Sequence, residues 1–290
     1  MKSRTRILIP VAALAVLGGL YAFASCSASV PSGGESASPS ASASASAGLD
    51  NGRNSGVGAD VMEDKRYLSN GTAYEWDGKL INYRAEWEEF LRSLPSRKAI
   101  DVLDTLDVAK WDSYNGYERE NFGERWVDVD GNGCNTRNDI LGRDLTGIEY
   151  TSNKYRCVVK SGELYDPYSG QQIHFDRSES DQVQIDHIVA LYNAWRTGAQ
   201  DFSYEDRVAI ANDPYNLIAV DGDTNFEKSD GDASQWLPRD EDFRCEYVAR
   251  QIGVKARYNL WVTEKEKKAL RTVLNVDCQG TELPSYDSIR

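Results

Sequence analysis

The sequence is poor in histidine and in positive charge, and it contains no closely spaced cysteine pair. Only two histidines occur among its 290 residues. No C-x-x-C pair exists, and no histidine stands near a cysteine at ligand spacing, which counts against a structural zinc site. The 33 Lys and Arg residues are outnumbered by 46 Asp and Glu, giving a net charge of −13. Such a chain is a poor electrostatic match to nucleic acid, because Lys and Arg supply most non-specific affinity for phosphate.

The N-terminus has the features of an export signal. A positively charged segment precedes an apolar run from Ile7 to Leu20, which is long enough for a signal peptide and short for a transmembrane helix. The small residues that follow end at Cys26 and resemble a bacterial lipoprotein box, with Phe23 where such boxes usually carry Leu. We predict a signal peptide over residues 1–26 with Cys26 as a lipidation site. Ordinary cleavage nearby and an uncleaved anchor are the alternatives.

A change of composition separates this signal from the rest of the chain. Ser, Ala, Gly and Pro dominate residues 27–65, which cannot bury enough surface to offset their chain entropy and are predicted to form a disordered linker. Residues 66–290 are the predicted folded domain, with a helical extension at its N-terminal end. The chain is 40% hydrophobic and has seven Trp and sixteen Tyr, which argues against wholesale disorder.

Four cysteines follow the linker: Cys134, Cys157, Cys245 and Cys278. Outside the cytoplasm four cysteines suggest two disulfides, for which three connectivities exist. We favour pairing of sequence neighbours, Cys134 with Cys157 and Cys245 with Cys278, because it closes the shortest loops. The cysteines therefore support an extracytoplasmic protein, either secreted or held at the cell surface by a lipid.

The apolar pattern predicts an α+β fold without internal repeats. Apolar residues at helical spacing between Tyr83 and Leu106, interrupted at Pro95, predict two helices. Alternation around a "DPYSG" turn predicts a hairpin over residues 154–175, with the second histidine, His174, in the hairpin or at the surface. Further strands are predicted at residues 181–187 and 216–220. Further helices are predicted at residues 190–199 and 203–213, from residue 224, and at 262–275, where Thr263 and Glu266 form a capping box.

The surroundings of His187 combine a strand, a second strand and a helix, with polar residues at each junction. Asp186 and His187 end the first strand, and the helix after the second strand contains Asn225 and Lys228. Metal-assisted phosphodiester hydrolysis requires such groups, since Asp186 and Asn225 can supply oxygen ligands while phosphate and water fill the other positions. A nearby imidazole can take the proton of the attacking water, and the cation stabilises the developing charge.

The pattern "DHIVAL…NDPYNLIAV…N…K" resembles the HNH nuclease motif of the ββα-metal superfamily. It is most similar to secreted bacterial HNH proteins grouped with the GmrSD C-terminal domain. The similarity continues through "GYERENFGERWVDVDGNGCNTRNDIL", "SGELYDPYSG" and "WLPRDEDFRCEYVARQIGVKARYNLWVTEKEKKAL", and covers roughly Leu103 to Cys278. The resemblance implies a ββα-metal core with added helices and a hairpin, stabilised by disulfides.

The resemblance also implies roles for single residues. His187 corresponds to the general base and Asp186 to the first metal ligand. Asn216 corresponds to the middle Asn, which fixes the loop and orients the histidine. Asn225 corresponds to the third position, where a neutral oxygen favours Mg²⁺ or Mn²⁺ over zinc, and Lys228 to a phosphate contact. The alternatives are a structural role for His187, a turn for Asn216 and a helix N-cap for Asn225.

The segment "DVDGNGCNTRND" allows three interpretations. Asp128, Asp130 and Asn132 have the spacing of a calcium loop, with Asp139 in the twelfth place but without the usual bidentate Glu, so a structural Ca²⁺ is one hypothesis. The second, which we prefer slightly, places Arg137 and Asp139 at the border of the active cleft, with Arg137 binding the scissile phosphate. The third is a plain turn.

One stretch of the acidic chain is basic. Between Arg244 and Arg271 there are eight Lys or Arg and three Glu, a local surplus of five positive charges. It predicts a face that contacts the nucleic-acid backbone without reading bases. A solvated helix face is the alternative.

These observations lead to two hypotheses about function. The first is an extracytoplasmic, metal-dependent HNH nuclease that hydrolyses DNA, or RNA, without sequence specificity. The second is a non-catalytic surface lipoprotein that binds a wall or protein ligand on the same scaffold. The joint presence of Asp186, His187, Asn216 and Asn225 favours the nuclease, since a binder needs none of them. The partners expected are nucleic acid and, if Cys26 is lipidated, the membrane; no protein partner is evident.

Overall fold

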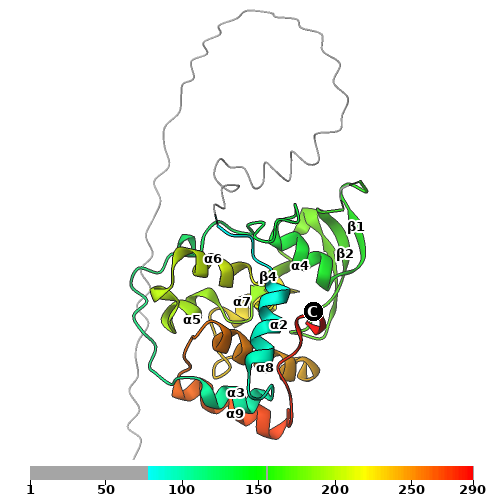
Figure 1. The fold of residues 1–290 in the computed structure, drawn as a ribbon. Helices are drawn as coiled ribbons and strands as arrows, with labels where there is room; N and C mark the ends of the chain where they lie inside the picture. The colour runs from blue at the N-terminus through cyan, green and yellow to red at the C-terminus, as the bar shows by residue number, and fades with distance from the viewer. Residues whose placement is uncertain (1–77, 155, 290) are drawn as a thin grey trace, which may run out of the picture. The chain divides into compact units, whose positions relative to one another are not determined.

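The computed structural model describes residues 78–154 and 156–289, which carry eight α-helices and five strands and form an α+β fold (Figure 1). These residues belong to one unit of the chain. The predicted signal peptide, Cys26 and the linker of residues 27–65 lie outside the described residues. Among the helices that are described, none is both long and apolar enough to cross a lipid bilayer.

Three antiparallel strands form the larger sheet, in the order β1–β2–β3. The predicted hairpin is confirmed as β2 (Val159–Tyr165) and β3 (Gln172–Asp176). Its turn is held by Asp166, whose carboxylate accepts hydrogen bonds from the backbone of the two residues after Pro167, as Asp does in many turns. The third strand, β1 (Thr146–Tyr150), was not predicted; it is short, irregularly paired and mostly exposed, so it lacks a clear alternating pattern.

The second sheet has two antiparallel strands and carries His187. They are β4 (Val183–His187) and β5 (Leu217–Asp221), both predicted, and His187 is opposite Leu217 in the register. The chain leaves β5 directly into α7 (Gly222–Lys228), whose N-cap Asp221 accepts a hydrogen bond from the backbone of Thr224. This gives the strand, strand, helix order expected around His187.

The remaining helices largely follow the apolar pattern. The predicted helices are confirmed as α2 (Tyr83–Ser93), α3 (Ala99–Thr105), α5 (Leu191–Arg196), α6 (Tyr204–Asn212) and α9 (Glu264–Val276). The capping box of α9 is present. Helix α4 (Thr136–Asp144) follows the aspartate-rich segment. The longest helix, α8 (Glu241–Arg257), was not predicted. Ten of its seventeen residues are buried, polar ones included, so it has no simple apolar stripe.

The buried apolar residues form two clusters. The larger one joins α2, α3, α8 and α9, and Figure 1 shows α3, α8 and α9 grouped at one end of the unit. Within it Trp87 stacks on Tyr215, with 3.7 Å between ring centroids. The smaller cluster lies between α4 and both sheets and includes Ile140, Leu141, Val159, Phe175, Val183, Ile185 and Leu217. Because β4 and β5 contribute to this cluster, α4 and the larger sheet position the strand that ends at His187.

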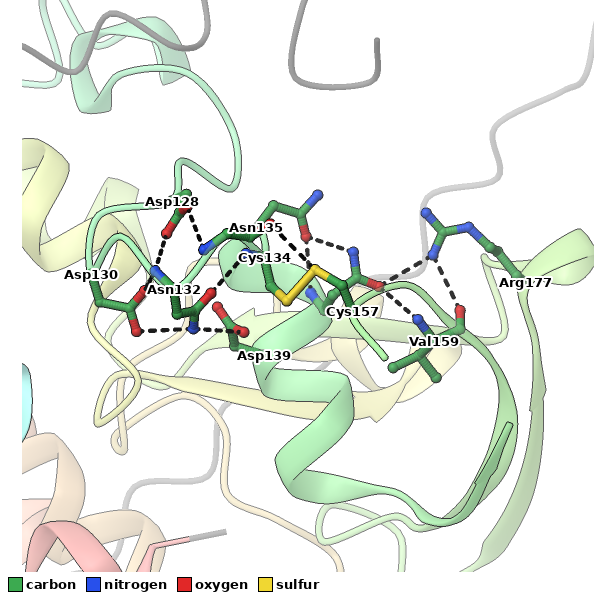
Figure 2. Close-up of a disulfide and its surroundings, with 11 residues drawn as sticks. Asp128, Asp130, Asn132, Cys134, Asn135, Asp139, Cys157, Val159 and Arg177 are labelled. Atoms are coloured by element: carbon green, nitrogen blue, oxygen red, sulfur yellow. Dashed lines mark hydrogen bonds between the residues drawn. A yellow bond between two sulfur atoms is a disulfide. The ribbon is translucent and has the colours of Figure 1, made fainter. Parts of the chain in front are cut away.

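Two disulfides link the predicted cysteine pairs. Cys134–Cys157 joins the segment before α4 to the segment before β2, across 23 residues (Figure 2). Cys245–Cys278 joins α8 to the residues after α9, across 33 residues. The predicted connectivity is therefore confirmed.

Candidate active site

His187 is the last residue of β4, and its ring is fixed by a backbone carbonyl. Its Nε2 lies 2.9 Å from the carbonyl oxygen of Ala211, in α6. Since a carbonyl only accepts, Nε2 carries the hydrogen and Nδ1 of the neutral ring keeps its lone pair. Burial first, and then the positive charge of Arg119, lower the pKa of His187 to about 3. The imidazole is therefore neutral at physiological pH, so Nδ1 can accept a proton, but its burial makes it a weaker base than a free imidazole.

Asn216 ties the segment after His187 to neighbouring backbone. Its side chain is fully buried, and Oδ1 accepts a 2.8 Å hydrogen bond from the backbone N–H of Val189. Its Nδ2 donates to the carbonyls of Val189 and Ile210, at 3.3 and 3.4 Å. These contacts hold the turn after His187 against α6, which is the position expected of a residue that fixes the loop.

Asp186 is buried and faces two donors. The hydroxyl of Tyr168 donates to Oδ2 at 2.6 Å, and Nζ of Lys228 lies 2.9 Å from Oδ2 and 3.1 Å from Oδ1. Nζ of Lys228 also donates to the carbonyl of His187 at 2.9 Å. The side chain of Lys228 has no exposed surface, so the phosphate contact expected of it is not the contact that the structure shows.

Asn225 lies inside α7, so the N-cap alternative is excluded: the cap is Asp221. The Nδ2 of Asn225 donates a 2.8 Å hydrogen bond to Oε1 of Gln184, on β4. The two oxygen donors predicted for a metal, Asp186 and Asn225, thus come from adjacent elements of the ββα unit. As they lie, they do not fit a divalent cation, because both oxygens of Asp186 face the ammonium of Lys228. In the described part of the chain, no group of three or more His, Cys, Asp or Glu side chains could hold a metal.

The predicted calcium loop is a turn held by its own hydrogen bonds (Figure 2). The two carboxylate oxygens of Asp128 accept from the backbone N–H groups of Asn132 and Gly133, at 3.1 and 2.9 Å. The side-chain amide of Asn132 donates to Asp130 and Asp139, both at 3.1 Å. This is the plain-turn interpretation, and the structural Ca²⁺ finds no ligand cluster among the described residues.

A cleft of about 840 Å³ lies near His187, which is not itself one of the lining residues. Its wall includes Trp126, whose ring is parallel to that of His187 within 11°, with 6.2 Å between centroids. Gln184, the partner of Asn225, also lines it. Its charged lining consists of four arginines and three acids: Arg119, Arg125, Arg137, Arg177, Glu120, Glu124 and Asp181. The cleft thus carries a surplus of one positive charge in a chain of net charge −13.

Arg137 lines this cleft and donates a hydrogen bond to the carbonyl of Val183 at 3.1 Å. Asp139, predicted beside it, contacts Asn132 instead and does not line the cleft. Sequence reasoning missed the other lining residues, most of which come from the segment "RENFGERW" and from β3, β4 and the connection between them. That segment has no period, and its adjacent Arg125 and Trp126 were the only local signal.

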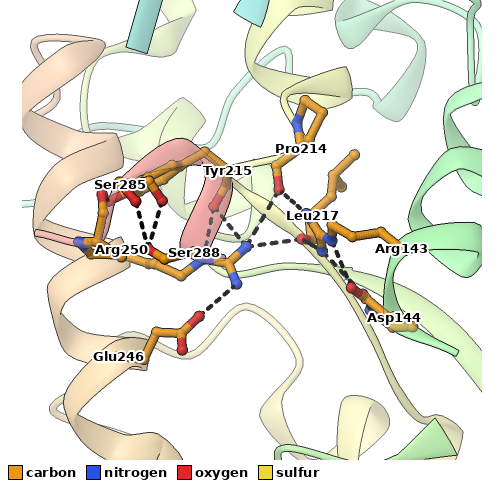
Figure 3. A network of polar contacts seen from close by, with 11 residues as sticks. Arg143, Asp144, Pro214, Tyr215, Leu217, Glu246, Arg250, Ser285 and Ser288 are labelled. Atoms are coloured by element: carbon orange, nitrogen blue, oxygen red, sulfur yellow. Dashed lines mark hydrogen bonds and ion pairs between the residues drawn. The ribbon is translucent and has the colours of Figure 1, made fainter. Parts of the chain in front are cut away.

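The basic stretch predicted as a backbone-binding face is largely structural, so the prediction of one continuous face was wrong. Arg250 is fully buried and donates to the carbonyls of Tyr215 and Leu217, at 2.8 and 2.9 Å (Figure 3). Lys255 is buried against Glu266, with Nζ 2.7 Å from the carboxylate. Three others pair with acids: Arg244 with Glu241, Arg257 with Glu86 and Arg271 with Asp104. These cations hold α8 and α9 in place rather than forming one surface.

Comparison with known proteins found one matching family and one similar protein. Residues 135–273 match the family described as GmrSD restriction endonucleases, C-terminal domain. The chain is also 36% identical, over 186 residues, to an uncharacterized secreted protein of Arthroderma benhamiae, covering 63% of this chain and 87% of that protein. No solved structure matches the chain significantly. This match supports an HNH-like endonuclease family for the chain. The matched domain accounts for residues 135–273 of the chain, and the grouping with secreted bacterial members stays a prediction.

Proposed function

We propose that the protein is an extracytoplasmic nuclease that hydrolyses phosphodiester bonds of DNA or RNA with His187 as its general base. The observation that carries this is the contact of His187 Nε2 with the Ala211 carbonyl, which leaves the lone pair on Nδ1. The ring of His187 is parallel to that of Trp126, which lines an arginine-rich cleft. The match to an endonuclease family supports the same chemistry.

The chain's own residues account for three parts of the reaction. Nδ1 of His187 accepts the proton of the attacking water. Arg137, at the cleft wall, holds the scissile phosphate through charge-assisted hydrogen bonds. Asn216 positions the histidine by holding the turn that follows it. No base-reading contact is needed, which agrees with cleavage without sequence specificity.

HNH-type nucleases generally use a divalent metal, which stabilises charge on the phosphate and the leaving oxygen. Asp186 and Asn225 would supply oxygen donors to Mg²⁺ or Mn²⁺ here, but only after the ammonium of Lys228 has left Asp186. The metal requirement is thus a part of the proposal that the experiment below tests separately.

The two disulfides support the proposed extracytoplasmic location. Two disulfides persist in oxidising surroundings and are rare in the cytosol. The relative from Arthroderma benhamiae is a secreted protein. Together with the predicted signal peptide, these support an extracytoplasmic location, with lipidation at Cys26 as the proposed means of attachment to the membrane.

The decisive experiment measures cleavage of plasmid and of single-stranded substrates by the oxidised protein, with Mg²⁺, with Mn²⁺ and with EDTA. His187→Ala should lower the rate by roughly 10²–10⁴-fold, the usual contribution of a general base. The matched control is His174→Ala, because His174 is the other histidine and lies exposed on β3. Equal rates for the two variants, with equal melting temperatures, would remove His187 from the mechanism.

The alternative is a non-catalytic protein that binds its ligand on the same scaffold. The observation that favours it is the Lys228–Asp186 contact, because it occupies the carboxylate that a cation would need. Absence of cleavage by the wild-type protein with every substrate and metal would select this alternative.

A further inference from the structure

Trp126 is held in an uncommon backbone conformation at the wall of the cleft. Its φ of 62° lies in the left-handed region, which bulky residues seldom adopt. Such outliers persist where the surroundings impose them, and they are frequent at functional sites. Close contacts on both sides of the residue hold this segment.

Two anchors fix the segment that carries Trp126. Before it, Gly123 packs so closely on α6 that a Cβ there would lie 2.6 Å from Cγ2 of Val208 and 3.2 Å from the hydroxyl of Tyr204. After it, the hydroxyl of Thr136, in α4, donates a 2.6 Å buried hydrogen bond to the carbonyl of Val127. The backbone on either side of Trp126 is thus held against α6 and α4.

Two of the four cleft arginines, Arg119 and Arg125, come from the same segment as this indole, together with Glu120 and Glu124. Arg119 donates to the carbonyl of Gly123 at 3.0 Å, and its pKa is lowered by burial first and then by the charge of Arg125. The two guanidinium groups therefore repel each other, and an anion between them relieves the repulsion. The three acidic side chains of the lining repel phosphate, so only a short stretch of a polyanion can bind favourably in the cleft.

The combination of aromatic and cationic groups in the cleft distinguishes single-stranded from duplex nucleic acid. In a duplex the base faces are stacked on one another and only base edges are exposed in the grooves, so an indole at a cleft wall can stack only on an unpaired base. Arginines and aromatic rings in one groove are typical of single-strand binding. The broad basic face that duplex binding would use is not formed by α8 and α9, whose buried cations are structural.

We infer that this cleft binds single-stranded nucleic acid, with an unpaired base stacked on Trp126 and its flanking phosphates held by the cleft arginines. Tyr204, which is 48% exposed and lines the same cleft, offers a second ring. The inference rests on the proposed function, because it names the substrate class of that site.

The test measures binding by fluorescence anisotropy, in EDTA and in a His187→Ala background, so that no substrate is cleaved. The probes are a short mixed-sequence DNA strand, the RNA of the same sequence, the DNA duplex, and an abasic strand with the same number of phosphates. The normal strands should bind more tightly than the abasic strand by roughly 5–150-fold, which corresponds to about 1–3 kcal/mol per stacked base. The duplex should bind more weakly than either single strand.

Variants test whether the preference for normal over abasic strand depends on the indole of Trp126. Trp126→Ala should remove most of the preference for normal over abasic strand, and Trp126→Phe should keep most of it. Tyr165→Ala is the matched control, since Tyr165 is an exposed aromatic residue on β2 outside this cleft, and it should change nothing. Because Trp126 also packs against the smaller core cluster, Tyr204→Ala serves as a second variant with less effect on folding.

The outcomes separate this inference from the proposed function. Equal affinity for normal and abasic strands, tighter binding of duplex, or a preference that survives Trp126→Ala in a folded protein would overturn the inference alone, even if cleavage is observed. A clear preference for unpaired bases without cleavage under any metal condition would support the inference and overturn the nuclease proposal. Binding of RNA and DNA strands to similar extents agrees with both.

Discussion

Nζ of Lys228 lies 2.9 Å from Oδ2 of Asp186, in a pair whose lysine side chain is fully buried. The two residues are 42 positions apart, one on β4 and one on α7, so the pair joins the second sheet to the helix of the ββα unit. A buried charge that loses its partner is strongly unfavourable, and this gives the pair a measurable role in folding.

Lys228→Ala should therefore destabilise the protein by about 3–5 kcal/mol, because it leaves the Asp186 charge buried without its partner. Chemical denaturation of wild type and variant measures the difference. The control is Lys160→Ala, since Lys160 pairs with Glu149 at 3.3 Å on the exposed sheet and should contribute about 0–1 kcal/mol. If Asp186 accepts a divalent cation once Lys228 is gone, excess Mn²⁺ should raise the melting temperature of Lys228→Ala and leave that of Asp186→Ala/Lys228→Ala unchanged. Comparable losses for the buried and the exposed lysine would contradict the first expectation.

Arg125 should contribute to binding through charge alone. It is exposed at the cleft, and losing one phosphate contact on a single strand should reduce the slope of log affinity against log salt by about 0.7. Arg125→Gln should show this change in a salt titration with single-stranded DNA. Lys268→Gln removes an equally exposed cation from α9, outside the cleft, and should leave the slope at the wild-type value. A larger effect of Lys268→Gln than of Arg125→Gln would indicate that nucleic acid binds at α9 instead of in the cleft.

Removing the disulfide between α8 and the segment after α9 should lower stability by about 2–4 kcal/mol, chiefly by relaxing the unfolded chain. The double variant Cys245→Ala/Cys278→Ala, unfolded by urea beside the oxidised wild type, measures this loss. Cleavage should persist at temperatures where the variant stays folded, because this disulfide lies away from the residues lining the cleft. Loss of activity without loss of stability would point to an unrecognised link between α8 and the site.

His174 should titrate above its ordinary range. Its Nδ1 lies 2.7 Å from Oε1 of Glu163, and this hydrogen bond raises the pKa of the imidazole. Because the folded pKa lies above the unfolded value, any stabilisation by this pair is complete below the unfolded pKa and disappears as pH rises through the folded pKa. Proton NMR of the imidazole follows the titration, and Glu163→Gln should return the pKa toward its usual value. A pKa that Glu163→Gln does not change would exclude the contact in solution.

Local sequence accounted for the framework around His187. Alternation predicted β4, the short run "NLIAV" predicted β5, Pro95 separated two helices, and Thr263 with Glu266 predicted the start of α9. Each of these signals lies within a few residues, where period, proline geometry and capping act directly on the backbone. Loop length was enough to favour the disulfide connectivity that the structure shows.

Tertiary structure alone decided which charges are buried and which face the cleft. Lys228 and Arg250 look in sequence like surface cations, yet one meets Asp186 and the other meets the carbonyls of Tyr215 and Leu217. The cleft likewise combines residues from the segment before α4, from α4, from the β3–β4 connection and from α6. Composition and period specify how each element forms, but the burial of a charge depends on a partner many residues away. That partner is brought within hydrogen-bonding distance only when the elements pack.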